Sequence, residues 1–153
     1  MTRIEDHIEI DAAPANVFRF CHNPDHRADW DERVTRVEVL TPEPVRRGTL
    51  IRVDAARSGK FVFSWDAEYS EFQFPSSSKV KVLDAAPSSS FGSGTETWEF
   101  SSMGGGGTRF TLVWEYKPRG FIARIMDVLG RRAATRRAIR RSLANLKDLV
   151  EAR

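Results

Sequence analysis

The 153-residue sequence predicts a single α+β domain, spanning 1–153, in which a curved seven-stranded antiparallel sheet surrounds a long C-terminal helix. Two short helices are expected between the first and second strands. Three observations carry this prediction. Apolar and polar residues alternate in seven segments separated by turn sequences, which is typical of a half-buried antiparallel sheet. The last segment instead has apolar residues at helical spacing. A hydrophobic fraction of 41% and a charged fraction of 29% are typical of one globular domain.

The N-terminal elements follow from alternation and from the placement of prolines. Isoleucines alternate with charged residues from Thr2 to Ile10, which indicates a strand with one buried face. Pro14 suits the first turn of a short helix, expected over Pro14 to His22, and Asn23-Pro24 ends that helix. A second helical turn is expected from Asp25 to Asp29.

The middle of the chain predicts six more strands. Short turn sequences rich in proline, serine or glycine separate them, so consecutive strands should pair as an antiparallel meander. The expected strands are Val34–Leu40, Thr49–Arg57, Phe61–Phe72, Ser78–Leu83, Ser90–Ser101 and Thr108–Lys117.

Large aromatic residues gather on one face of this sheet. Alternation places Trp65 and Tyr69 on the same face of one strand, and gives Trp98, Trp114 and Tyr116 the same inward parity on two others. These side chains can form a plain core. They can equally line an apolar pocket, because buried indole and phenol groups need polar partners and pockets combine apolar walls with a few polar groups.

Glu96 shares the inward parity of these aromatic residues. A desolvated carboxylate has a raised pKa, which would suit it to acid or base chemistry on a bound ligand. The alternative places Glu96 at the open end of its strand, either solvated or paired with an arginine. It is the single weak candidate for a catalytic residue.

The C-terminal segment from Arg119 to Ala152 predicts one long amphipathic helix. We expect its side with Ile122, Ile125, Met126 and Leu129 to pack onto the aromatic face of the sheet. Gly130 lowers local helix stability, so a slight bend or a close backbone approach is expected there.

Arginines are concentrated in this last quarter of the chain, although the net charge is only +3. Such a run is typical of the solvated face of a helix, but it could also attract nucleic acid or an anionic membrane. We expect Arg137 and Arg141 to be solvated. Arg132 and Arg136 project within the apolar stripe, so they should pair with an aspartate or hold an acidic ligand group. The candidate aspartates are Asp25, Asp29 and Asp31.

Metal, cofactor and nucleophile motifs are not evident. Cys21, His22 and His26 lie close in sequence, but Asn23-Pro24 breaks the helix that would align them, so no metal site is expected. Cys21 lies on the apolar side of its helix and is expected in the core. Because Cys21 is the single cysteine, no intrachain disulfide can form. The sequence also has no apolar run long enough to span a bilayer and no signal-peptide pattern, so we expect a cytoplasmic protein. No cofactor is expected.

The element order and several short motifs resemble one protein family. The motifs are Ile8-Glu9-Ile10-Asp11-Ala12-Ala13-Pro14, Asn23-Pro24-Asp25 before Trp30, Gly94-Thr95-Glu96-Thr97-Trp98-Glu99-Phe100, and Trp114-Glu115-Tyr116. Over nearly its whole length, the chain resembles the polyketide cyclase/dehydrase-like proteins of the superfamily of START domains and birch-pollen-allergen relatives. The resemblance implies a helix-grip fold with a cavity for lipids, steroids, quinones or polyketide intermediates. It carries over no catalytic motif, and fold alone does not give activity.

Three functions remain open from the sequence. The first is binding of a small hydrophobic ligand between sheet and helix. The second is a cyclase, aromatase or dehydratase that uses the same cavity, and the third is binding of an anionic surface or nucleic acid through the arginine-rich helix. We favour the first, with no nucleic acid and no stable membrane insertion expected. The predicted ligand-binding residues are Trp65, Tyr69, Glu96, Trp98, Trp114, Tyr116, Ile122, Ile125, Met126 and Leu129.

Overall fold

The computed structural model describes the backbone of residues 1–57, 61–85 and 91–153. Its first half contains β1 (Thr2–Ile10), α1 (Pro14–His22), α2 (Pro24–Trp30), β2 (Arg36–Val39), β3 (Leu50–Arg57) and β4 (Phe61–Gln73). The second half contains β5 (Ser77–Ala85), β6 (Phe91–Ser102), β7 (Thr108–Pro118), α3 (Gly120–Met126), a π-helical segment (Asp127–Arg131) and α4 (Arg132–Glu151). The turns expected at Ser58-Gly59 and Ala86-Pro87 lie outside the described residues.

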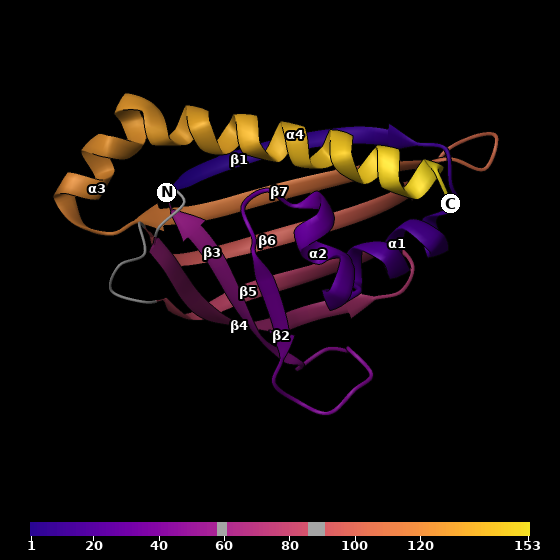
Figure 1. The fold of residues 1–153 in the computed structure, drawn as a ribbon, viewed down its shortest axis with the longest axis horizontal. Coiled ribbons are helices and arrows are strands. Elements are labelled where there is room, and N and C mark those ends of the chain that lie inside the picture. The colour runs from indigo at the N-terminus through magenta and orange to yellow at the C-terminus, as the bar shows by residue number, and fades with distance from the viewer. Residues whose placement is uncertain (58–60, 86–90) are drawn as a thin grey trace.

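The seven strands form one antiparallel sheet in the order β1-β7-β6-β5-β4-β3-β2. The sheet curves, and α4 runs along β1 while α1 and α2 lie on the same face of the sheet as α4 (Figure 1). This arrangement confirms the predicted α+β fold, with two short helices before the second strand. Within the described ranges, no helix is long and apolar enough to cross a membrane.

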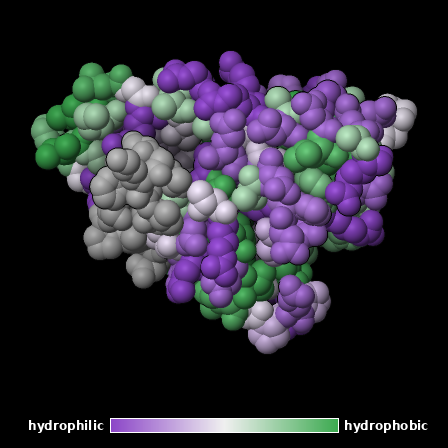
Figure 2. All heavy atoms as spheres, in the orientation of Figure 1, coloured by the Kyte–Doolittle hydropathy of each residue, from purple (hydrophilic) through white to green (hydrophobic). Residues whose placement is uncertain are grey.

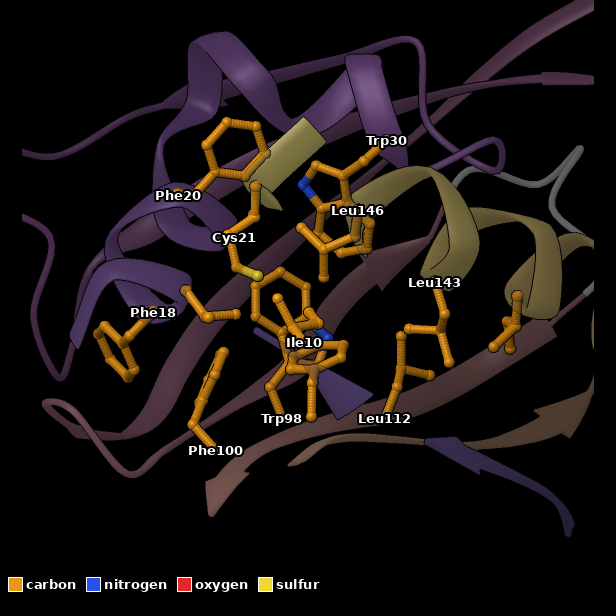
Figure 3. Close-up of a cluster of buried hydrophobic side chains, with 14 of the residues drawn as sticks. Ile10, Phe18, Phe20, Cys21, Trp30, Trp98, Phe100, Leu112, Leu143 and Leu146 are labelled. Atoms are coloured by element: carbon orange, nitrogen blue, oxygen red, sulfur yellow. The ribbon is translucent and has the colours of Figure 1, made fainter. Parts of the chain in front are cut away.

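One end of the space between sheet and helices is solidly packed. Four side chains of α4, namely Ile139, Leu143, Leu146 and Val150, belong to this cluster. They pack with side chains of α1, α2 and the long strands, including Ile10, Phe18, Trp30, Trp98, Phe100, Phe110 and Leu112 (Figure 3). We call this cluster the packed core. It confirms the predicted core position of Cys21, which is 1% exposed; burial raises the pKa of its thiol.

His22 is also part of this end of the molecule, and protein groups contact both of its ring nitrogens. Its two ring nitrogens lie 2.7 Å from the Phe18 carbonyl oxygen and 2.7 Å from Ser78 Oγ. Its ring stacks on Phe18 and meets Trp98 edge-on. Burial lowers the pKa of His22 to about 4, so the ring is neutral at neutral pH.

The packing prediction for the start of the C-terminal helix was wrong. The side chains of Ile122, Ile125, Met126 and Leu129 are 77%, 42%, 46% and 74% exposed, respectively. The π-helical segment contains Gly130 and divides the predicted single helix into α3 and α4. Because a π turn holds more residues than an α turn, it rotates the faces of α3 and α4 relative to each other. The apolar stripes of the two helices therefore face different surroundings, and the bend expected at Gly130 is present (Figure 1).

Candidate functional site

A cavity of about 390 Å³ lies between the sheet and the first turns of α4. On the helix side its walls are Ala134, Thr135 and Ala138, which are small compared with the leucines and isoleucine farther along α4. The sheet contributes aliphatic side chains from β3 and β5, which are Ile51, Val53, Ala55, Val80 and Val82. The cavity exists because small helical side chains face a wide curved sheet at this end.

A continuous row of aromatic rings forms one wall of the cavity. Trp65 on β4 and Phe91 on β6 meet edge to face with centroids 5.3 Å apart, and Phe91 meets Trp114 on β7 in the same way at 5.3 Å. Trp114 in turn stacks on Tyr116 at 5.5 Å. Gly94 permits this arrangement, because a Cβ atom there would overlap the ring of Trp114.

A buried network of four charged residues closes the cavity on the side of the packed core. Asp31, which is 0% exposed, lies 2.9 Å from the guanidinium groups of both Arg27 and Arg33. Glu96 reaches the same two arginines, at 3.4 Å from Arg27 and 2.7 Å from Arg33. The Arg27 guanidinium also lies over the ring of Trp98, 4.7 Å from its centroid. Two positive and two negative groups therefore balance one another in a buried setting.

The network fixes the charge states of Asp31 and Arg33. Burial alone would raise the pKa of Asp31, but the charges of Arg33 and Arg27 outweigh burial and hold that pKa well below its usual range. Burial would lower the pKa of Arg33, and the charges of Asp31 and Glu96 outweigh it and raise that pKa. Asp31 and Arg33 therefore stay ionised across the ordinary pH range.

Glu96 contributes a paired carboxylate to the cavity wall. Its Oε1 atom lies 2.7 Å from Arg33 in an ion pair and is itself buried. Glu96 is 8% exposed and lines the cavity, so its side chain brings a carboxylate held by Arg27 and Arg33 to the cavity wall.

A second polar cluster anchors the helical end of the cavity. Asp127, in the π-helical segment, accepts hydrogen bonds from Tyr116, from Thr2 at 2.8 Å and from Arg132 at 2.9 Å. Burial would raise the pKa of Asp127, but these hydrogen bonds outweigh it and lower that pKa. The pKa of Tyr116 is raised by burial and by its bond to Asp127, so the phenol stays neutral. The cluster ties the π-helical segment to β1 and β7.

The structure brings together only part of the predicted site. Trp65, Glu96, Trp114 and Tyr116 line the cavity, whereas Trp98 lies in the packed core. Tyr69 belongs to a smaller apolar cluster with residues of β3 and the segment before β2. The residues lining the cavity, as the structure describes it, do not include the four exposed apolar residues of α3 and the π-helical segment. Their role in ligand binding stays a prediction.

The expected partners of the helix arginines were also wrong. Arg132, the first residue of α4, pairs with Asp127 in the preceding π-helical segment, and Asp31 is held by Arg27 and Arg33 instead. Arg136 is exposed. The helical wheel of an unbroken α-helix placed Arg132 and Arg136 within the stripe of Ile122, Ile125 and Leu129. Both arginines lie in α4, and the π-helical segment before them changes how their face relates to that stripe.

Three residues of the site escaped sequence reasoning. Phe91 is the first residue of β6, and its serine-rich neighbours in sequence gave no sign of a buried strand there. Arg27 has a usable signal, since Asp31 follows it at the i,i+4 spacing of a helical ion pair. The burial of Arg27 and Arg33 has no sequence signal, because charged residues are rarely buried and an isolated arginine predicts a solvated one.

Comparisons with known proteins agree with this geometry. The profile of the family described as polyketide cyclase/dehydrase and lipid transport matches residues 1–151. The chain belongs to this family. No curated protein sequence matches the chain.

Solved structures of other proteins share the fold. The protein TTHA0849 from Thermus thermophilus is 22% identical with a TM-score of 0.78, covering 99% of this chain and 98% of that one. The ZhuI aromatase/cyclase from Streptomyces sp. R1128 is 16% identical with a TM-score of 0.80, covering 98% of this chain and 93% of that one. At these identities the likeness establishes the helix-grip fold and leaves the ligand to be argued from the cavity.

Proposed function

We propose that the protein binds a small hydrophobic molecule, of the size and character of a lipid, quinone, steroid or polyketide, in the cavity between the sheet and α4. The single observation that carries this proposal is the cavity itself, with its row of aromatic rings and its buried charged network. Apolar pockets with a few convergent polar groups are typical of small-molecule sites. The family's description, which includes lipid transport, supports it. A cytoplasmic location remains a prediction from the single cysteine.

The Glu96 carboxylate in the cavity wall favours ligands with a hydrogen-bond donor at one end. A hydroxyl group placed against this carboxylate would have a charged acceptor, while the rest of the ligand lies against Trp65, Phe91 and Trp114. Hydrogen bonds to charged groups contribute about 1.5–3 kcal/mol. A hydroxylated ligand should therefore bind about tenfold or more tightly than the matching hydrocarbon.

The test is a titration of tryptophan fluorescence with matched pairs of hydroxylated and unsubstituted lipids, quinones and aromatic polyketides. Gly94→Ala adds a methyl group against Trp114 and should weaken binding several-fold, whereas Gly92→Ala, which has open space around it, should not. If no ligand binds at micromolar concentrations, or if the two glycine variants behave alike, the proposed cavity function is wrong.

An enzyme of cyclase or dehydratase type is the second candidate, and the titratable residues in the cavity wall favour it. The described lining contains no histidine, cysteine or serine, so acid or base chemistry would fall to Glu96, Glu32 or Tyr116. Glu96→Gln separates the candidates. If the protein is a carrier, this variant should lose at most about tenfold in affinity for a hydroxylated ligand, because the Gln amide oxygen still accepts a hydrogen bond. An enzyme that transfers a proton through Glu96 should bind its substrate and lose turnover by about a hundredfold. A parallel unfolding measurement is needed, because the change also removes a charge from the buried network.

A further inference from the structure

The outer face of α3 and the π-helical segment carries the largest group of exposed apolar side chains that the structure describes. These side chains are Phe121, Ile122, Ile125, Met126, Val128 and Leu129, exposed by 42% to 77%. We call them the α3 patch; it forms the apolar projection at one end of the molecule (Figure 2). Contiguous exposed apolar surface of this kind marks an interaction site.

The segment formed by α3 and the π-helical residues turns its apolar side outward, which is the reverse of an ordinary amphipathic helix on a protein surface. Ala123 is partly buried, and Asp127, four residues later on the same face, is 1% exposed and held by the anchor to Thr2, Tyr116 and Arg132. The polar side of the segment therefore faces the protein and the apolar side faces outward. Hydrogen bonds to Asp127 hold the segment in this orientation even though it exposes the patch.

The stretch of chain that contains the patch is strongly basic. From residue 119 to residue 147 the sequence holds nine basic residues and a single acidic one, which is the buried Asp127. Arg124, Arg136 and Arg137 are exposed, and in the ranges that the structure describes they form no ion pair. An exposed apolar face flanked by arginines has the composition of a helix that lies in the interface of an anionic bilayer.

A second copy of the chain fits this surface less well. A two-fold interface brings the same patch of both copies together, so the arginines beside one patch would face those of the other. Nucleic acid would use the arginines but would leave six apolar side chains in water. An anionic membrane satisfies the charge and the apolar surface together.

We propose that the α3 patch docks the protein reversibly onto anionic lipid membranes. The patch lies next to the cavity, because Arg131, Ala134 and Thr135, which follow it in the chain, line the cavity. A docked molecule would hold that end of the cavity against the lipid surface. The patch residues are exposed and are separate from the residues that would bind a ligand. Membrane docking can therefore fail experimentally while ligand binding in the cavity is confirmed, and ligand binding can fail while docking is confirmed.

The experiment is flotation of the full chain with vesicles of phosphatidylcholine, with and without added phosphatidylglycerol. We expect binding that requires phosphatidylglycerol and weakens with salt. The double variant Phe121→Ser, Leu129→Ser should lower the apparent affinity for these vesicles by about tenfold or more. The double variant Arg124→Gln, Arg137→Gln should remove about tenfold of the preference for anionic vesicles.

Matched controls distinguish the patch from general stickiness. Leu83→Ser removes an apolar side chain that is 51% exposed on β5, and Arg46→Gln with Arg47→Gln removes two exposed charges before β3. Both controls should bind vesicles as the parent does, and circular dichroism should show every variant folded. Absence of binding to anionic vesicles at low salt would overturn the proposal. Equal loss in patch and control variants, a patch-dependent dimer in sedimentation without vesicle binding, or binding to duplex nucleic acid in place of vesicles would each overturn it as well.

Discussion

The two ends of the space between α4 and the sheet differ although the same helix and the same strands build both. At the packed end, Ile139, Leu143 and Leu146 fill the gap and are at most 2% exposed. At the hollow end the helix offers Ala134 and Ala138, and a cavity of about 390 Å³ remains. Side-chain volume along one helix therefore decides where a ligand site opens, while the backbone frame stays the same.

The charged network lies where the two ends meet. Arg27 covers the ring of Trp98 in the packed core, and its partner Glu96 lines the cavity. Buried ion pairs add little to stability compared with apolar packing, so their value here is positional. The network separates a dry core from a binding space and presents a carboxylate oxygen at the boundary.

The largest expected effect tests whether the packed end carries the stability. Leu143→Ala removes a side chain that is 2% exposed and should lower the free energy of unfolding by about 2–5 kcal/mol. Leu129→Ala makes the same chemical change where the side chain is 74% exposed, and should alter it by less than about 0.5 kcal/mol. Urea denaturation measures both. Similar losses in the two variants would contradict the difference between the ends.

A smaller effect is expected from pH, again at the packed end. Folding lowers the pKa of His22 to about 4. Between about pH 6.5 and about pH 4, His22 is therefore protonated in the unfolded chain and neutral in the folded protein. The contribution of His22 to the free energy of unfolding should have its full value above about pH 6.5. It should fall as the pH is lowered toward 4, by on the order of 1–2 kcal/mol at about pH 5. Denaturation curves at several pH values measure this loss. His22→Gln should remove most of this pH dependence. His7→Gln, which changes a histidine outside the packed core, should keep it. An unchanged pH dependence in His22→Gln would assign the loss of stability to other groups.

The smallest effect concerns filling the hollow end. Ala138→Leu places a larger side chain in the cavity wall and should lower ligand affinity by about tenfold, with the fold retained. Ala144→Leu makes the same change at an exposed position of α4 and should bind ligand as the parent does. Fluorescence titration with one ligand compares the two. Undiminished affinity in Ala138→Leu would place the ligand elsewhere.

The sequence predicted the fold well because periodicity reports which face of a strand is buried. The alternation around Trp65, Trp114 and Tyr116 identified one wall of the cavity, and the inward parity of Glu96 was correct. Parity cannot say how far along the strand a residue lies, so Trp98 was assigned to the cavity rather than to the core. The π-helical segment had a partial signal in Gly130, but the resulting rotation of α3 depends on contacts of Asp127 with β1 and β7 that are distant in sequence.

The buried thiol of Cys21 makes the packed end a reporter of its own motions. It is the single cysteine of the chain, it is 1% exposed and burial raises its pKa, so a thiol reagent can reach it as a thiolate only after this region opens. The labelling rate of the native protein therefore measures how often α1 separates from the sheet. Ligand bound in the neighbouring cavity should slow the labelling of Cys21 only if the packed end and the hollow end open as one cooperative unit. A labelling rate that does not change with ligand would show that the two ends open independently.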